Sequence, residues 1–145
     1  MNRSTDPSRS ALEQGRPAAA SIAFMLITVV SGITIRFAHL GLPASIVKYG
    51  GSALWAVMIY WVCSTLLPSW HPLWGALISG ILGTVVEFLK LYSPPWLDVF
   101  RNTLPGILLL GRIFNPWDIF VYWVAIVLAA GFDVKVRVHN STTKH

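Results

Sequence analysis

The chain has 145 residues, of which 54% are hydrophobic and only 12% are charged. Soluble domains carry about 25% charged residues, so this composition excludes an ordinary soluble globular protein and indicates a protein embedded largely in lipid. The net charge of +5 comes from basic residues scattered between apolar runs, a pattern typical of charges that flank membrane spans rather than of a nucleic-acid-binding surface.

The first apolar run occupies residues 18–37, after a polar segment of mixed charge at residues 1–17 that we expect to be disordered. A run of about 20 apolar residues is long enough to cross the hydrocarbon core of a bilayer. No small-residue cleavage site closes the run, so we interpret it as a transmembrane span rather than as a cleaved signal peptide. A short connection over residues 39–49 follows, in which Pro43 fits either a turn or the first position of a helix.

The next two apolar runs form a predicted helical hairpin. Residues 51–67 make the second span, which Pro68 ends because proline cannot continue a helix. Residues 73–91 make the third span. The few residues between the spans allow only a tight turn, so we expect the spans to be antiparallel neighbours. Trp70 and Trp74 flank this turn, as aromatic residues do at the boundary between water and lipid.

Small residues recur on one face of the third span. Gly75, Ser79 and Gly83 are four residues apart, and Glu87 continues the series. Residues at this spacing share one face of a helix, and small residues on that face let a neighbouring helix approach closely in lipid. We therefore expect this face, including Glu87, to point into the bundle rather than toward the lipid.

Residues 92–116 are the least regular part of the chain and are rich in proline, glycine and charged residues. The apolar stretch at residues 104–110 is too short to span a bilayer. Non-helical backbone at membrane depth is tolerated only where protein or water covers it. We therefore expect this segment to be interfacial or re-entrant.

The last span is predicted at residues 117–132, because Asn115, Pro116 and Asp118 form a typical start signal for a helix. Residues 134–145 then form a polar C-terminal tail. The sequence predicts an all-α integral membrane protein whose membrane domain covers residues 18–133. We expect a bundle of about four transmembrane helices, with the interfacial or re-entrant segment before the last helix.

Charged residues near membrane depth gather at one end of this antiparallel bundle, whereas the opposite end holds only His71 and the two tails. An ionisable residue inside a span indicates a functional site by default, because its insertion into lipid is costly. The residues of the candidate polar site are Arg36, Lys48, Glu87, Lys90, Arg101, Arg112 and Asp118.

Two interpretations of Glu87 stay open. It forms either a structural ion pair, with Lys90 one turn away or with an arginine of the site, or part of a headgroup, ion or proton site. Arg101 and Arg112 have planar guanidinium groups that suit a phosphate or a carboxylate. The alternative for these two arginines is ordinary headgroup contact together with pairing to nearby acids.

Several kinds of site are not expected. Cys63 is the only cysteine, which excludes an intrachain disulfide and a thiolate metal cluster. The four histidines are far apart in loops or tails, so we expect no metal site and no cofactor. The sequence also contains none of the common catalytic motifs. Membrane lipids are the expected partners, a homo-oligomer is compatible with the sequence, and no nucleic acid is expected.

Three stretches of the sequence resemble a known family. They are residues 36–38 with 48–60, residues 87–103, and residues 110–125. Together they resemble domain of unknown function 2809, a family of small bacterial integral membrane proteins, and the order of Glu, Arg and Asp is distantly similar to the VanZ-like family. The resemblance implies a multi-pass protein of the bacterial cytoplasmic membrane. It implies no reaction, because the family has none assigned.

Two positions depart from the family's pattern. Ser52 stands where members usually have Asp, and Lys90 stands where they usually have Gln. One acid is lost and one base is gained, so the resemblance implies a more positive site here if the two residues adjoin.

We expect the charged end to bind a lipid headgroup or an anionic amphiphile, or else to be structural. The alternative is a membrane-embedded enzyme that acts on a lipid or cell-envelope precursor, with Glu87 as general base and Arg101 placing an anionic group. A small transporter ranks third, because four short spans enclose a water path only as an oligomer.

Overall fold

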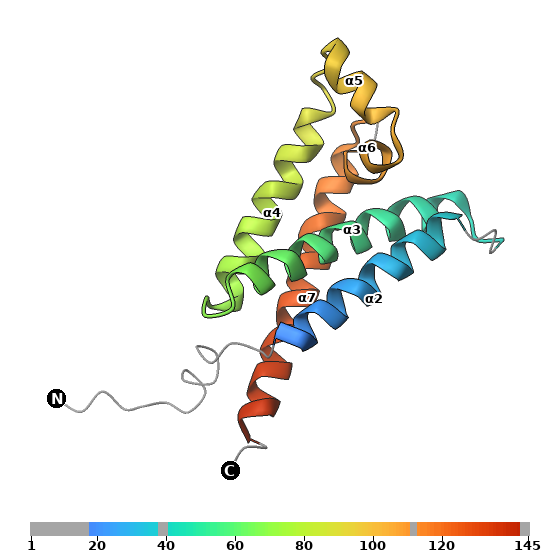
Figure 1. Ribbon diagram of the computed structural model, residues 1–145. Helices are drawn as coiled ribbons and strands as arrows, with labels where there is room; N and C mark the ends of the chain where they lie inside the picture. The colour runs from blue at the N-terminus through green and yellow to red at the C-terminus, as the bar shows by residue number, and fades with distance from the viewer. Residues whose placement is uncertain (1–17, 38–40, 111–112, 143–145) are drawn as a thin grey trace.

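The computed structural model describes residues 18–37, 41–110 and 113–142. Within this part of the chain the fold is entirely helical, with no strand (Figure 1). The helices are α2 (Ala18–Phe37), α3 (Ala44–Leu66), α4 (Pro72–Leu89), α5 (Pro95–Arg101), α6 (Leu104–Leu109) and α7 (Pro116–Thr142). The predicted all-α class is therefore confirmed.

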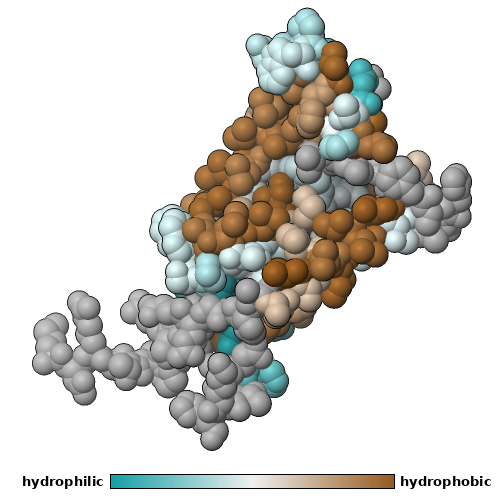
Figure 2. Space-filling view, viewed as in Figure 1, coloured by the Kyte–Doolittle hydropathy of each residue, from teal (hydrophilic) through white to brown (hydrophobic). Residues whose placement is uncertain are grey.

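Three of the described helices are long and apolar enough to cross a membrane. They are α3, α4 and the part of α7 from Pro116 to His139, while α2 contributes a shorter apolar stretch over Ala19–Ile35. Large apolar side chains such as Leu66 and Leu128 are about 70% exposed on these helices, and soluble proteins rarely expose so many together. In the face seen in Figure 2, hydrophobic residues dominate and the paler or hydrophilic residues lie chiefly toward the ends. The fold is that of a multi-pass membrane protein.

The helix α3 begins earlier than the sequence predicted. The connection over residues 39–49 was expected to last until Tyr49, but α3 starts at Ala44. Pro43 has an extended backbone, and its carbonyl oxygen accepts from the amides of Ile46 at 2.9 Å and Val47 at 3.2 Å. Pro43 is thus the N-cap of α3, and residues 44–49, which were expected in the connection, belong to the helix.

The helix α7 also continues beyond its predicted end. Residues 134–142 were expected to form a polar tail, yet they are helical as far as Thr142. Asp133 and Arg137 explain the extension, because they are four residues apart and both are buried against other parts of the protein. Tertiary contacts hold a stretch that has little helical hydrophobic pattern of its own.

The helices form two antiparallel pairs, α2 with α3 and α4 with α7 (Figure 1). A tight turn joins α3 to α4, as predicted. The helix α2 packs mainly on α3. The described start of α2 and the described end of α7 lie toward the same end of the molecule. An even number of membrane passes requires this arrangement.

The small face of α4 is buried, which confirms the predicted close approach of neighbouring helices. A Cβ atom added to Gly80 would lie 2.5 Å from the ring of Trp123 in α7. A Cβ atom added to Gly83 would lie 3.3 Å from the ring of Tyr122. The residues of this face are Gly75, Ala76, Ser79, Gly80, Gly83 and Glu87. They leave room for the aromatic rings of α7.

The two short helices α5 and α6 cover the end of the bundle at which α4 ends and α7 begins (Figure 1). They pack on each other closely, because Gly106 in α6 lies against the carbonyl of Phe100 in α5, where no side chain would fit. Trp96 and Val99 of α5 are about 70% exposed. The irregular segment thus forms two short helices that are too short to span a membrane.

Candidate functional site

Glu87 lies at the end of α4 and has no exposed surface. Lys90 donates to its Oε2 atom, and Tyr122 Oη donates to the same atom at 3.0 Å. The backbone amide of Asn115 donates to its Oε1 atom at 2.7 Å. Glu87 therefore joins α4 to α7 and to the segment before α7. The ion pair of Glu87 with Lys90 across one helical turn, which the sequence offered as one interpretation of Glu87, is present.

Asp118 lies beside this pair, in the first turn of α7, and is 4% exposed. Its Oδ1 atom accepts a hydrogen bond from the side-chain amide of Asn115 at 3.0 Å. Its Oδ2 atom is 4.0 Å from Nζ of Lys90. The ammonium group of Lys90 thus lies near two buried carboxylates, one from α4 and one from α7.

A cavity of about 980 Å³ opens next to this cluster. Its walls come from α2, α3, α6 and the start of α7, and most of them are apolar. The polar residues at one end are Lys48, Ser52, Lys90, Asp118 and Tyr122. Ser52 and Lys90, the two departures from the family's pattern, therefore lie on the same cavity. Glu87 does not line the cavity, but it accepts hydrogen bonds from Lys90 and Tyr122, which do.

Lys48 is exposed and lies one turn into α3. Its Nζ atom is 5.4 Å from the centroid of the Tyr49 ring. Lys48 lines the cavity together with Lys90 and Asp118. The structure thus brings these three members of the predicted site to one cavity.

Arg101 lies elsewhere, at the turn between α4 and α5. It is 3% exposed, and its Nη2 atom donates to the carbonyl oxygen of Leu89 at 2.6 Å. Its Nη1 atom contacts Ser93 Oγ and Asp98 Oδ1, each at 3.4 Å. Arg101 thereby gives the Leu89 carbonyl at the end of α4 a second donor, in addition to the backbone amide of Tyr92 at 3.0 Å. It is not part of the cavity lining.

Two further members of the predicted site are not placed. The side chain of Arg36 and the whole of Arg112 lie outside the described residues. Among the described residues, no three of His, Cys, Asp and Glu lie close enough together to hold a metal ion.

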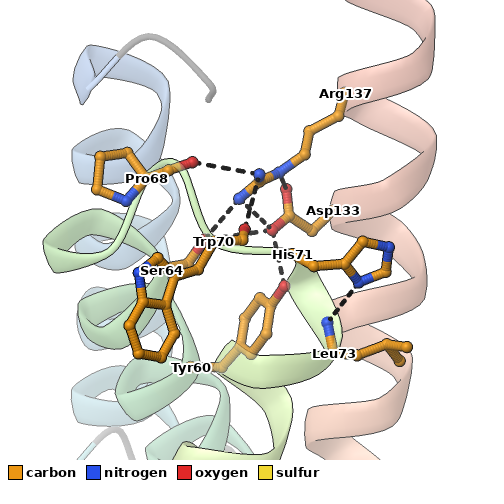
Figure 3. A network of polar contacts seen from close by, with 8 residues as sticks. All are labelled: Tyr60, Ser64, Pro68, Trp70, His71, Leu73, Asp133 and Arg137. Atoms are coloured by element: carbon orange, nitrogen blue, oxygen red, sulfur yellow. Dashed lines mark hydrogen bonds and ion pairs between the residues drawn. The ribbon is translucent and has the colours of Figure 1, made fainter. Parts of the chain in front are cut away.

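A second buried polar cluster lies at the opposite end of the bundle (Figure 3). Asp133 Oδ2 accepts from Tyr60 Oη at 2.7 Å and from Ser64 Oγ at 3.2 Å. Arg137 Nε donates to Asp133 Oδ1 at 3.1 Å. Arg137 also donates to the carbonyl oxygens of Pro68 and Trp70, each at 3.3 Å. This cluster ties the end of α7 to α3 and to the turn between α3 and α4.

The sequence interpretation placed His71 and the two tails at this end of the bundle but missed this buried cluster. Asp133 was the last residue of the predicted membrane domain, just after the last span, and Arg137 was assigned to the polar tail. Their spacing gave a usable signal, because they continue the buried face of α7 at intervals of three or four residues after Ile126 and Ala129. His71 itself has a local role, since its Nδ1 atom accepts from the amide of Leu73 at 3.3 Å at the start of α4.

The comparisons with known proteins support one assignment. A family model described as "Protein of unknown function (DUF2809)" matches residues 41–126, which is more than half of the chain. No solved structure matches. The matched range includes α3, α4, the short helices and the part of α7 that lines the cavity. The chain therefore belongs to the DUF2809 family, whose function is unknown.

Proposed function

We propose that this chain is a multi-pass protein of the bacterial cytoplasmic membrane that binds one membrane amphiphile in the cavity. The hydrocarbon part lies along the apolar walls and a phosphate-bearing headgroup lies at the charged end. The observation that carries this proposal is the cavity itself, in which apolar walls from three helices end at a cluster of charged side chains.

The walls suit a hydrocarbon chain. Helix α2 contributes Val29 and Ile33, α3 contributes Leu54 and Met58, and α6 contributes Ile107, among others. The volume of about 980 Å³ is near the upper end of the range for small-molecule sites, about 300–1,000 Å³. A lipid chain gains little free energy by moving from the bilayer to an apolar wall. The polar end must therefore supply the selectivity.

The polar end suits a phosphate. Lys48 and Lys90 both line it, and the lysine ammonium group is a common phosphate ligand. Lys48 is one turn into α3, Lys90 follows the end of α4, and Asp118 is in the first turn of α7. All three therefore lie near helix ends on one side of the bundle, which is the depth at which lipid headgroups lie.

The geometry supports binding better than catalysis by Glu87. Both of its carboxylate oxygens accept hydrogen bonds, from Lys90, Tyr122 and the amide of Asn115. Glu87 is also absent from the cavity lining. A general base must reach the proton that it removes, and Glu87 would first have to lose these contacts.

Gly51 offers a direct test. It lines the cavity, and a Cβ atom added there meets nothing within 4 Å, so a phenylalanine at this position would fill the cavity without a clash on its Cβ atom. Gly50 has the same open surroundings but does not line the cavity. Gly50→Phe is therefore a matched control that adds the same side chain to the same helix.

The measurement is native mass spectrometry of the purified chain in detergent micelles, titrated with phosphatidylglycerol. We expect one bound phospholipid on the wild type and on Gly50→Phe. We expect Gly51→Phe to lose at least about tenfold in affinity, since the added ring occupies the space beside Ser52 that the ligand needs. Equal binding by the two variants, with both folded, would show that the cavity is not the lipid site.

A further inference from the structure

We propose that Asp118 makes the site selective for an amine-bearing phosphate headgroup, the chemistry of phosphatidylethanolamine. This inference rests on the proposed function and names the ligand class of the same cavity. Lys48 and Lys90 would hold the phosphate, and the carboxylate of Asp118 would accept a hydrogen bond from the ammonium group.

The balance of charge at the polar end is the first argument. Two cationic side chains, Lys48 and Lys90, line the polar end of the cavity together with the anionic Asp118. The anionic Glu87 forms an ion pair with Lys90. The four charges cancel. A headgroup that carries only negative charge would meet Asp118 with no compensating cation of its own. A headgroup with one phosphate and one ammonium group matches both signs.

The state of the Asp118 carboxylate is the second argument. Its Oδ1 atom accepts from Asn115, but among the described residues no group donates a hydrogen bond to Oδ2. Lys90 Nζ lies 4.0 Å from Oδ2, and that ammonium is already bonded to Glu87. The side chain is 6% exposed and lines the cavity. A carboxylate oxygen that lines a cavity and has no donor within the described residues can accept from a ligand, and hydrogen bonds to charged groups are among the stronger ones.

The spacing of the groups is the third argument. Lys90 and Asp118 lie side by side in the lining, with 4.0 Å between the ammonium nitrogen and the carboxylate oxygen. The phosphate and amine of an ethanolamine headgroup are joined by only a two-carbon bridge. One headgroup can therefore contact the lysine and the aspartate at the same time.

The test compares two lipids with identical acyl chains, phosphatidylethanolamine and phosphatidylcholine. Both are zwitterionic, but in phosphatidylcholine methyl groups replace every N–H donor. By native mass spectrometry of the purified chain, we expect the wild type to prefer phosphatidylethanolamine by at least about tenfold, the size expected for a hydrogen bond to a charged group. Asp118→Asn should reduce the preference to less than about threefold while phosphatidylglycerol still binds.

Asp98→Asn is the matched control. Asp98 is also an aspartate in the first turn of a helix, but its side chain is 50% exposed and it does not line the cavity. This variant should keep the wild-type preference. Phosphatidylglycerol binding by Asp118→Asn reports that the variant is folded. The preference of the wild type for phosphatidylethanolamine is measured on the unmodified protein, so it does not depend on the folding of any variant.

The outcomes separate the two proposals. Equal affinity of the wild type for the two zwitterionic lipids, with binding still blocked by Gly51→Phe, would overturn the role of Asp118 and leave the amphiphile site in place. The same holds if Asp118→Asn binds phosphatidylglycerol and keeps the full preference. Failure of all three lipids to bind the wild type would instead overturn the proposed function, and this inference with it.

Discussion

At the scale of single residues, the position of Glu87 shows how a carboxylate is kept inside a membrane bundle. A charged group at the centre of a span costs about 2.5–3.5 kcal/mol on insertion scales, and less near an end. Glu87 lies near the end of α4 and receives three hydrogen bonds, from Lys90, Tyr122 and Asn115. It is therefore the centre of a satisfied network, whereas Lys90 depends on Glu87 and, at 4.0 Å, on Asp118.

Because Glu87 has three donors and Lys90 has one main partner, we predict that replacing Glu87 costs more folding stability than replacing Lys90. Glu87→Leu should lower the free energy of unfolding by about 3–5 kcal/mol, because it leaves the ammonium of Lys90 buried without its main partner. Lys90→Gln should cost at most about 1.5 kcal/mol, since Glu87 keeps its two other donors and an amide can still donate. Denaturant unfolding in micelles, followed by tryptophan fluorescence, measures both. Equal costs would contradict the network as described.

At the scale of helices, the contact between α4 and α7 depends on small residues. Gly80 lies so close to the Trp123 ring that an added methyl group would stand 2.5 Å from it. Three atoms of this rigid ring lie within 2.7 Å of the added atom, so the ring or the helix would have to move to accommodate it. The small face of α4 therefore fixes the distance between the two helices that carry Glu87, Tyr122 and Asp118.

We predict that Gly80→Ala destabilises the protein by about 1–3 kcal/mol, the usual cost of overpacking. Gly131→Ala in α7 is the control, because an added Cβ atom there meets nothing within 4 Å. That variant should be neutral or more stable by up to about 1 kcal/mol, since alanine favours the helix over glycine. Thermal unfolding of the two variants in the same detergent is the measurement. If Gly80→Ala left the stability unchanged, α4 and α7 would have to lie further apart than described.

At the scale of the whole molecule, the two ends of the bundle differ in how they are held. The end with the turn between α3 and α4 is tied to α7 by Asp133 and Arg137, which contact Tyr60, Ser64 and the turn itself (Figure 3). At the other end, the start of α3 borders the cavity rather than a packed core. One end therefore holds the helices together while the other leaves room for a ligand.

We predict that Arg137→Lys loosens only the first of these ends. Lysine cannot reproduce the planar fork that reaches Asp133 and two backbone carbonyls at once, so about 1–3 kcal/mol of stabilisation should be lost. Hydrogen exchange should rise in residues 64–71 and stay unchanged around residues 48–52. Lys135→Arg, at an exposed position of the same helix, is the control. Faster exchange at both ends would indicate that they unfold as one unit.

Local patterns in the sequence predicted the helices and one ion pair. The buried small face of α4 and the pairing of Glu87 with Lys90 follow from spacings of three or four residues within one helix. The hairpin of α3 and α4 follows from Pro68 and the short connection after it. The composition alone was sufficient to indicate a multi-pass helical membrane protein. Such features are local, so no knowledge of the tertiary arrangement is required.

The tertiary structure decided which charged residues meet. It placed Arg101 on the carbonyl of Leu89, away from the cavity that Lys48, Lys90 and Asp118 share. It also extended α7 and buried Asp133 against Tyr60, a residue 73 positions away in the chain. Contacts between distant segments depend on how whole helices pack and tilt, and helical periodicity gives the direction of a face but not the partner that covers it.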